Sequence, residues 1–120
     1  MSAASKNFDA SEFACRCGCG FDSIRAELVY GLQCLRDALG MPIVITSGCR
    51  CAQHNLVVGG AANSQHVLGY AADIQVHGIT SDALARAAEQ VPELRAGGIG
   101  IYDSWVHVDV RGHRARWDKR

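Results

Sequence analysis

The sequence predicts an α+β domain in which a small antiparallel sheet carries its helices on one side. One long segment repeats leucine and isoleucine at steps of three and four residues, which is the spacing of a helix face. Four short segments are instead apolar or rich in β-branched residues, as buried and half-buried strands are. The 120 residues fit a single domain over 1–120, with loose tails expected at 1–10 and 112–120.

The first helix is expected over residues 23–39. Asp22 or Ser23 can cap its N-terminus, because their side-chain oxygens accept from backbone N–H groups. Gly40 and Pro42 end it, since glycine adopts the left-handed cap conformation and proline cannot continue a helix. The apolar stripe consists of Ile24, Leu28, Leu32, Leu35 and Leu39.

A buried strand is expected next at residues 43–46, and a second strand at 71–76. Residues 47–65 between them are rich in turn-forming residues and predict a loop, with one helical turn near 53–57.

A second helix is expected from Thr80 or Ser81 to about Val91, because either hydroxyl can cap its first turn. Pro92 then breaks the chain. Helices and strands that segregate in this way favour an α+β fold over alternating β-α units.

The last strands place polar chemistry on one face of the sheet. Residues 99–102 and 105–110 predict a β-hairpin. Side chains alternate between the faces of a strand, so His107 and Asp109 share the face opposite three valines. Asp73 likewise opposes a face of alanine, isoleucine and valine.

Imidazole and carboxylate groups on one open face are suited to hold a metal. His66 ends the loop seven residues before Asp73, and Gly69 permits a turn that would bring the two together. With His107 they make two imidazoles and one carboxylate, a recognised catalytic zinc set that leaves a fourth position for water. On spacing alone, a surface histidine and water-facing strand residues explain the same pattern.

Three motifs carry a resemblance to a known family. Residues 64–74, SQHVLGYAADI, are similar to the SxHxxGxAxD signature of the M15 peptidases, the zinc D-Ala-D-Ala carboxypeptidase family. Residues 46–55 resemble that family's SGYR…HN segment, and residues 98–109 resemble its closing GxGxY…HVD hairpin. The resemblance covers most of the chain. It is nearest to short phage and prophage members, several of which act as peptidoglycan hydrolases.

The resemblance implies a fold like those of the DD-peptidases and the hedgehog signalling domain, with His66, Asp73 and His107 as ligands of a catalytic zinc. Arg50 matches the family arginine that holds the substrate carbonyl or carboxylate. A guanidinium suits that task because it is always charged and presents a planar fork of donors. Cys49 stands where the family motif has tyrosine, which puts any role of that phenol in question.

The motifs leave the general base open. Related members carry a glutamate or histidine shortly before the last ligand, and Ser104 and Trp105 occupy those positions here. Asp109 is the nearest carboxylate on the correct face and is predicted to be catalytic. The alternatives are that Asp109 orients a ligand histidine or is itself a ligand.

The cysteines form a second group. Residues 11–22 make a compact Cys/Gly segment, too irregular for a helix or a strand. Some family members carry cysteines both there and beside the arginine, which is consistent with a structural zinc site or disulfides that pin the two segments together. Cys34 falls beside the leucine stripe and is expected to be buried. The candidate ligands of this second site are Cys15, Cys17, Cys19 and Cys51.

Composition narrows the expected partners. The formal net charge is zero, which argues against nucleic acid or an acidic membrane surface. No apolar run approaches the roughly 20 residues of a membrane span. The N-terminus lacks the apolar stretch of a signal peptide, so either cytoplasmic synthesis or a removed signal is expected. We expect a monomer.

The leading hypothesis is a zinc-dependent peptidase that cleaves D-amino-acid-containing peptidoglycan stem peptides or cross-links, as a carboxypeptidase or an endopeptidase. Zinc is then the cofactor and a peptidoglycan peptide the partner. Such a protein would act on the cell wall, as a phage or prophage product. The alternative is a non-catalytic, zinc-stabilised module that binds peptidoglycan or a virion partner, which the missing base favours.

Overall fold

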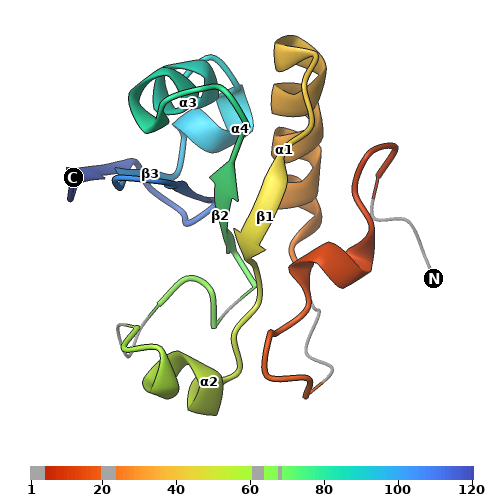
Figure 1. Ribbon diagram of the computed structural model, residues 1–120, viewed down its shortest axis with the longest axis vertical. Helices are drawn as coiled ribbons and strands as arrows, with labels where there is room; N and C mark the ends of the chain where they lie inside the picture. Colours follow the sequence, from red (N-terminus) through yellow and green to blue (C-terminus); the bar gives the residue numbers. More distant parts are fainter. Residues whose placement is uncertain (1–4, 20–23, 61–63, 68) are drawn as a thin grey trace.

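A computed structural model describes residues 5–19, 24–60, 64–67 and 69–120 of the chain (Figure 1). Its sheet has five strands in the order β1-β2-β4-β3-β5. The strands are β1 (Val44–Ser47), β2 (Ala71–Gln75), β3 (Gly98–Ile101), β4 (Val106–Asp109) and β5 (Ala115–Asp118). The helices are the 3₁₀ turn η1 (Ala10–Phe13), α1 (Ala26–Leu39), α2 (Ala52–Val57), α3 (Ser81–Ala88) and α4 (Pro92–Arg95).

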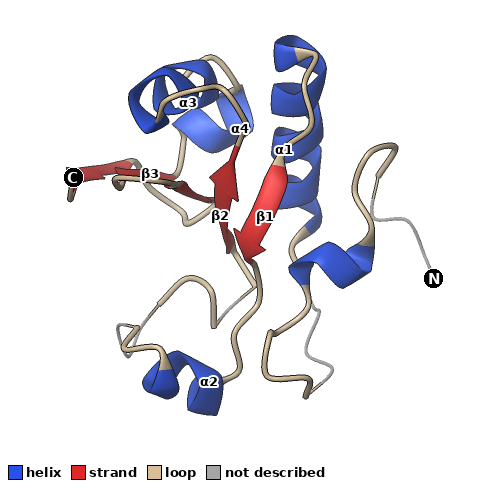
Figure 2. Cartoon of the chain, in the orientation of Figure 1, coloured by secondary structure: helices blue, strands red, loops and turns tan. Residues whose placement is uncertain are grey.

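The sheet is mixed, whereas the sequence predicted an antiparallel one. Strand β1 pairs antiparallel with β2, β2 with β4, and β4 with β3, and the last two form the predicted hairpin. Strand β5 pairs parallel with β3, at the edge seen with the C-terminus in Figure 2. The predicted loose tail at 112–120 is therefore wrong for β5. Arg116 holds this strand down by donating to both carboxylate oxygens of Glu89 and to the carbonyl of Gly97.

The first helix starts later than predicted. It begins at Ala26 with Arg25 as its N-cap, and that side chain makes no capping hydrogen bond. The predicted caps Asp22 and Ser23 lie outside the described residues. Gly40 ends the helix with φ of 65°, the left-handed conformation that favours glycine.

The second predicted helix is divided in two. Thr80 caps α3 by accepting from the backbone N–H of Ala83, as expected. The helix ends at Ala88, and Pro92 then starts the short helix α4 instead of only breaking the chain. Proline is tolerated there because the first turn of a helix leaves its N–H groups without intrahelical partners.

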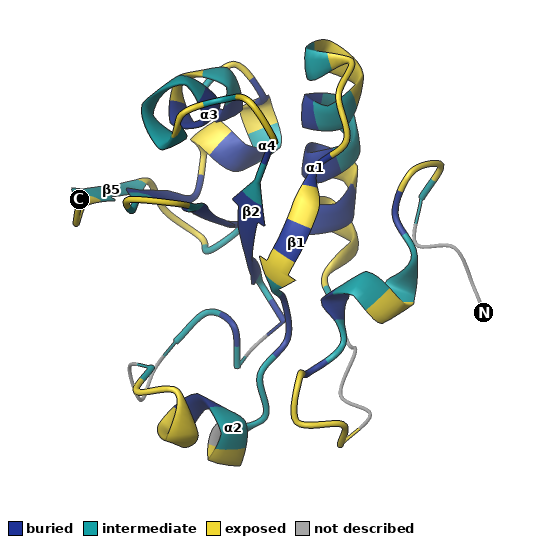
Figure 3. Ribbon diagram, viewed as in Figure 1, coloured by how far each residue is buried: buried dark blue, intermediate teal, exposed yellow. Residues whose placement is uncertain are grey.

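The core lies between α1, α3, α4 and one face of the sheet, and Figure 3 shows dark blue, buried stretches on α1, α4 and β2. The predicted leucine stripe supplies Leu28, Leu32 and Leu35, each fully buried. Phe8 and Phe13 also belong to this core, so the expected loose lead-in at 1–10 is packed at Phe8. Residues 1–4 of that lead-in lie outside the described residues. Within the described part of the chain, no helix is both long and apolar enough to cross a membrane.

The opposite face of the sheet carries the candidate site. Strand register aligns five positions in one row across the sheet, one from each strand. Because paired residues on neighbouring strands share a face, their side chains all belong to the face away from the core. The row consists of Ser47, Asp73, His107, Gly100 and Trp117.

Candidate metal centre

His66, Asp73 and His107 meet at the floor of a cleft. His66 Nε2 lies 3.2 Å from Asp73 Oδ1, and His107 Nδ1 lies 3.2 Å from the same oxygen. The three donor atoms lie within 4.8 Å of one another, and all three residues are buried. Strands β2 and β4 supply two of them, and the turn before β2 brings the third over the sheet. The structure thus brings together the three residues that were predicted from the alternation of side chains along the strands and from the family motifs.

The other nitrogen of each imidazole has a partner of its own. His66 Nδ1 lies 2.7 Å from the carbonyl oxygen of Gly48, and His107 Nε2 lies 2.7 Å from Asp109 Oδ2. A carbonyl or carboxylate oxygen accepts from these nitrogens, so each carries its proton on the outer side. With a metal bound, the inner nitrogens, His66 Nε2 and His107 Nδ1, would then be the lone-pair donors, on the side of Asp73. Metal-binding histidines are commonly fixed in this way.

The spacing of the donor atoms fits a metal ion. In a tetrahedral zinc site with bonds of about 2.0–2.1 Å, neighbouring ligand atoms lie roughly 3.3 Å apart. Both His–Asp separations match that edge at 3.2 Å. Two neutral imidazoles and a carboxylate also match the chemistry of a catalytic zinc site with three protein ligands. The residues present therefore fit the ion.

Electrostatics keep the carboxylate charged. Burial would raise the pKa of Asp73, but hydrogen bonds with His107 and His66 outweigh it and hold that pKa well below its usual range. Burial would likewise lower the pKa of His107, but hydrogen bonds with Asp109 and Asp73 raise it above its usual value. Without a metal, the proton of His107 partly balances these carboxylates, and a cation would replace it.

Arg50 stands beside the three donors. Its Nη2 lies 3.5 Å from Asp73 Oδ2, the oxygen that does not face the histidines. Its Nη1 donates to Asn55 Oδ1 at 2.9 Å, and its Nε donates to Ser47 Oγ at 3.3 Å. The guanidinium lines the cleft and is held from several sides. It is therefore preorganised to bind an anionic or carbonyl oxygen next to the metal position.

Asp109, which the sequence predicted to be catalytic, lies behind His107 and not in the cleft. Its side chain has no exposed surface, and its carboxylate accepts from the backbone N–H groups of Gly98 and Arg111. The Arg111 guanidinium also donates to both of its oxygens, with Nε bonded to Oδ1 and Nη2 to Oδ2. Burial would raise the pKa of Asp109, but hydrogen bonds from His107 and Arg111 keep it well below its usual range. This placement favours the orienting role over that of a base or a ligand.

Two glycines of β3 make room for this arrangement. A Cβ on Gly98 would overlap the carboxylate of Asp109, and a Cβ on Gly100 would overlap the indole of Trp117. Both positions face the site because they are two residues apart on one strand. The GxG pattern of the sequence motif thus has a steric reason here.

The cleft above the metal position has a volume of about 840 Å³. Tyr102 and Trp105 stack on one another, with ring centroids 4.6 Å apart, and form part of its wall. Trp117 lies 5.0 Å from the His107 ring and donates to the Tyr102 hydroxyl. Besides Arg50, the lining includes the cations Arg16, Arg111 and Lys119.

Sequence reasoning missed the C-terminal wall of the cleft. Arg111, Trp117 and Lys119 lie in or next to a stretch predicted as a loose tail, yet all three line the site. The alternation of Ala115 to Asp118 is too short to indicate a strand, and parallel pairing with β3 leaves no local signal.

The four cysteines singled out from the sequence also lie together. Their sulfur atoms are within 4.8 Å of one another, and they form a group separate from that of His66, Asp73 and His107. Cys34 is half-buried on α1, and Cys49 is buried beside Arg50.

Comparison with known proteins places this geometry in context. The profile of the peptidase M15 family matches residues 6–109. A zinc D-Ala-D-Ala carboxypeptidase of Streptomyces albus G is 43% identical over 90 residues, which cover 74% of this chain and 35% of that protein. The chain therefore spans about a third of the length of this relative.

Proposed function

This chain belongs to the peptidase M15 family, and we propose that it is a zinc-dependent peptidase acting on D-amino-acid-containing stem peptides of peptidoglycan. The observation that carries the proposal is the convergence of His66 Nε2, Asp73 Oδ1 and His107 Nδ1 at the floor of an open cleft. Three protein ligands leave a coordination position for water or substrate, which distinguishes catalytic from structural zinc sites. The cell wall is then its place of action.

Bound zinc would polarise the scissile carbonyl and lower the pKa of its water to near 7. The chain's own residues supply binding and orientation. Arg50, fixed by Asn55 and Ser47, is placed to hold the substrate carbonyl or carboxylate next to Asp73. Asp109 keeps His107 in the tautomer that presents Nδ1 to the ion, because its carboxylate accepts the Nε2 proton.

The charge of the cleft favours a carboxypeptidase over an endopeptidase. Four cations line it, and although Arg111 is paired with Asp109 behind the lining, Asp73 is the one acidic side chain among the described residues of the lining. A peptide that ends in a free carboxylate gains from this excess of positive charge, whereas an internal peptide bond does not. The name of the Streptomyces relative points in the same direction.

His54 is the candidate for the general base. It lines the cleft from α2, and apart from the two ligands it is the imidazole found there among the described residues. Ser104 and Trp105, which occupy the positions of the family base, offer no group that takes up a proton near neutral pH. The imidazole of His54 offers a ring nitrogen that can accept a proton.

The second candidate function is a zinc-stabilised module that binds the same peptides without cleaving them. The observation in its favour is that, among the residues that the structure describes, Asp73 is the one carboxylate in the cleft lining. Such a module would bind stem peptides through Arg50 and through Tyr102 and Trp105, the stacked aromatic residues in the cleft wall.

The test is incubation of the zinc-loaded protein with purified peptidoglycan and with a synthetic stem pentapeptide ending in D-Ala-D-Ala. Mass spectrometry should find loss of the terminal D-Ala, and the same peptide ending in L-Ala-L-Ala is the control. Cleavage of cross-links without loss of terminal D-Ala would make the protein an endopeptidase. Binding of the pentapeptide without any cleavage would establish the binding module instead.

A further inference from the structure

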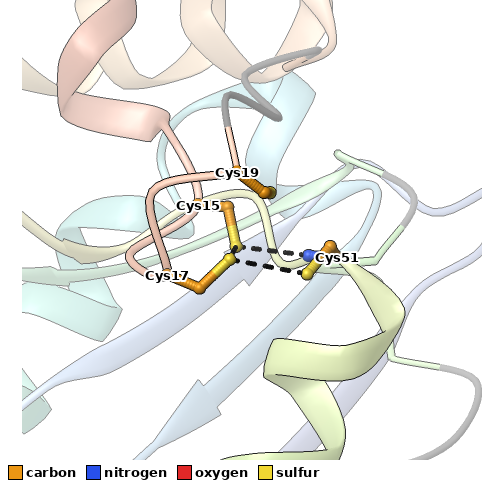
Figure 4. A group of neighbouring side chains, drawn as sticks. All are labelled: Cys15, Cys17, Cys19 and Cys51. Atoms are coloured by element: carbon orange, nitrogen blue, oxygen red, sulfur yellow. Dashed lines mark hydrogen bonds between the residues drawn. The ribbon is translucent and has the colours of Figure 1, made fainter.

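A second group of metal-binding side chains lies outside the cleft. Cys15, Cys17 and Cys19 follow η1, and Cys51 stands at the start of α2, more than thirty residues later in the chain. Figure 4 shows the sulfur atoms of Cys15, Cys17 and Cys51 turned toward one another, with Cys19 beside them. Every sulfur of the group lies within 4.8 Å of the others.

The sulfur spacing is that of a tetrahedral thiolate site. Cys15 Sγ lies 3.4 Å from Cys17 Sγ, and Cys17 Sγ lies 3.7 Å from Cys51 Sγ. Zinc–sulfur bonds of about 2.3 Å place neighbouring sulfurs in a tetrahedron roughly 3.8 Å apart. The four side chains are free thiols and so remain able to bind an ion.

Backbone N–H groups already point at two of the sulfurs. The N–H of Cys51 donates to Cys15 Sγ at 3.4 Å, and the N–H of His54 donates to Cys51 Sγ at 3.3 Å. Such bonds stabilise negative charge on sulfur, as the partners behind metal ligands commonly do.

We propose that Cys15, Cys17, Cys19 and Cys51 bind a second zinc ion in a closed, structural site. Four protein ligands leave no open position, so this ion takes no part in peptide cleavage. On binding, each thiol that is still protonated releases its proton to water and forms a zinc–sulfur bond, with no change of oxidation state.

The second ion would fix the loop that builds the catalytic site. Residues 48–51 contact the N-terminal segment, since the N–H of Cys49 donates to the carbonyl of Phe13. In the same loop, the carbonyl of Gly48 accepts from His66, and Arg50 directly precedes Cys51. An ion shared by Cys51 and the N-terminal cysteines would therefore hold both the partner of His66 and the substrate-binding arginine in place.

Cobalt substitution tests the site independently of activity. The reduced protein is freed of metal, loaded with Co²⁺ and examined by absorption spectroscopy. A thiolate site should give sulfur-to-cobalt charge-transfer absorption in the near ultraviolet and strong visible bands of tetrahedral cobalt. The His66→Ala variant should keep these bands, because the catalytic site contains no sulfur.

Single variants assign the ligands. Cys17→Ser and Cys51→Ser should weaken or abolish the charge-transfer band, whereas Cys34→Ser on α1 should leave it unchanged. In zinc-loaded reduced protein, metal analysis should find two equivalents in the wild type and one in the His66→Ala variant. Three results together would overturn the proposal: a single equivalent of zinc in the wild type, no charge-transfer band, and thiols of Cys15, Cys17, Cys19 and Cys51 that stay reactive in the presence of Zn²⁺. They would leave the proposed catalytic zinc unaffected.

Discussion

Each imidazole of the candidate site is assigned its role by the hydrogen bond on its far side. The backbone carbonyl of Gly48 selects Nε2 of His66 as the inner nitrogen, and Asp109 selects Nδ1 of His107. The two ligands thus use different nitrogens, and each depends on a different kind of acceptor. Side-chain identity alone does not reveal this, because either nitrogen of a histidine can bind a metal.

Asp109→Asn tests the orienting role at this scale. An amide can present its N–H₂ group to His107 and favour the wrong tautomer, so zinc affinity should fall about 10- to 100-fold. Competition with a chromophoric chelator measures the affinity, and activity is compared at saturating zinc. Asp118→Asn is the matched control, because that carboxylate pairs with Arg120 at the surface. Unchanged zinc affinity with activity lowered ~10²–10⁴-fold would instead make Asp109 the general base.

His54→Gln tests the proposed base. Turnover of the D-Ala-D-Ala pentapeptide should fall ~10²–10⁴-fold, with zinc content and thermal stability unchanged. The acidic limb of the pH profile of kcat/KM should also move or disappear, which a merely structural role would not cause. His113→Gln, at an exposed position, provides the comparison. Near wild-type turnover in His54→Gln would show that another group accepts the proton.

At the scale of single elements, the site depends on a row of five paired residues, one from each strand. Asp73 and His107 were predictable, because strand parity and the motif both indicate the open face. Gly100 and Trp117 complete that row, and the small residue on β3 is what admits the large one on β5. Sequence alone gave no sign of this pair, since β5 is short and its parallel partner lies fifteen or more residues away.

The other elements likewise divide into those that local sequence signals predict and those that depend on contacts between distant segments. Local signals predicted α1, the turn of α2, the Thr80 cap and the β3–β4 hairpin, because periodicity and capping act within a few residues. The burial of Phe8 and the place of Asp109 behind His107 depend on contacts between distant segments. The alternation of side chains along β4 put Asp109 on the correct face, but it could not show that Gly98 and Arg111 enclose this carboxylate.

Gly100→Ala tests the fit of β5. The added methyl group would overlap the indole of Trp117, so β5 must shift or Trp117 must leave its place beside His107. Overpacking of this kind typically costs about 1–3 kcal/mol of unfolding free energy. Denaturant unfolding measures that cost, and hydrogen exchange should show faster opening of β5 than of β2.

Gly112→Ala is the control for this substitution, because a Cβ there meets no atom within 4 Å. It should change the unfolding free energy by no more than about 0.5 kcal/mol. Equal stability of the two variants would mean that β5 is not seated against β3 as described.

At the scale of the whole molecule, one loop joins the two metal-binding groups. Residues 48–51 connect β1 to α2 and follow Ser47, the last residue of β1. Together these residues include, in chain order, Ser47, the Gly48 carbonyl, Arg50 and Cys51. The first three orient or flank the histidine site, and the last belongs to the cysteine group. A change at the cysteine group should therefore be transmitted to the cleft through backbone and not through the core.

The protonation of the histidine site should also set how the stability of the whole fold depends on pH. In the zinc-free chain the pKa of His107 is raised, so its contribution is complete below the unfolded value of about 6.5 and is lost as pH rises through the raised pKa. The pKa values of Asp73 and Asp109 are lowered, so their contributions are present above about 3.9 and are lost as pH falls. His107 is therefore the one of these three groups whose contribution is lost as pH rises above about 6.5.

Zinc should reverse the sign of that dependence. A bound ion requires neutral His107, so protons compete with it less as pH rises, and ligand binding stabilises the folded state in proportion to its affinity. We expect the zinc-free protein in chelator to lose stability as pH rises above about 6.5, by at most about 1.4 kcal/mol per pH unit, and the zinc-loaded protein to gain it. Thermal unfolding of both forms in matched buffers measures the two slopes.

The zinc-free His107→Gln variant is the reference for this measurement. Subtracting its slope from that of the zinc-free wild type removes contributions from the thiols, which both proteins share. His113→Gln should behave as the wild type. If wild type and His107→Gln have the same slope without zinc, the proton on His107 does not stabilise the fold, and the carboxylates Asp73 and Asp109 are balanced by Arg50 and Arg111 alone.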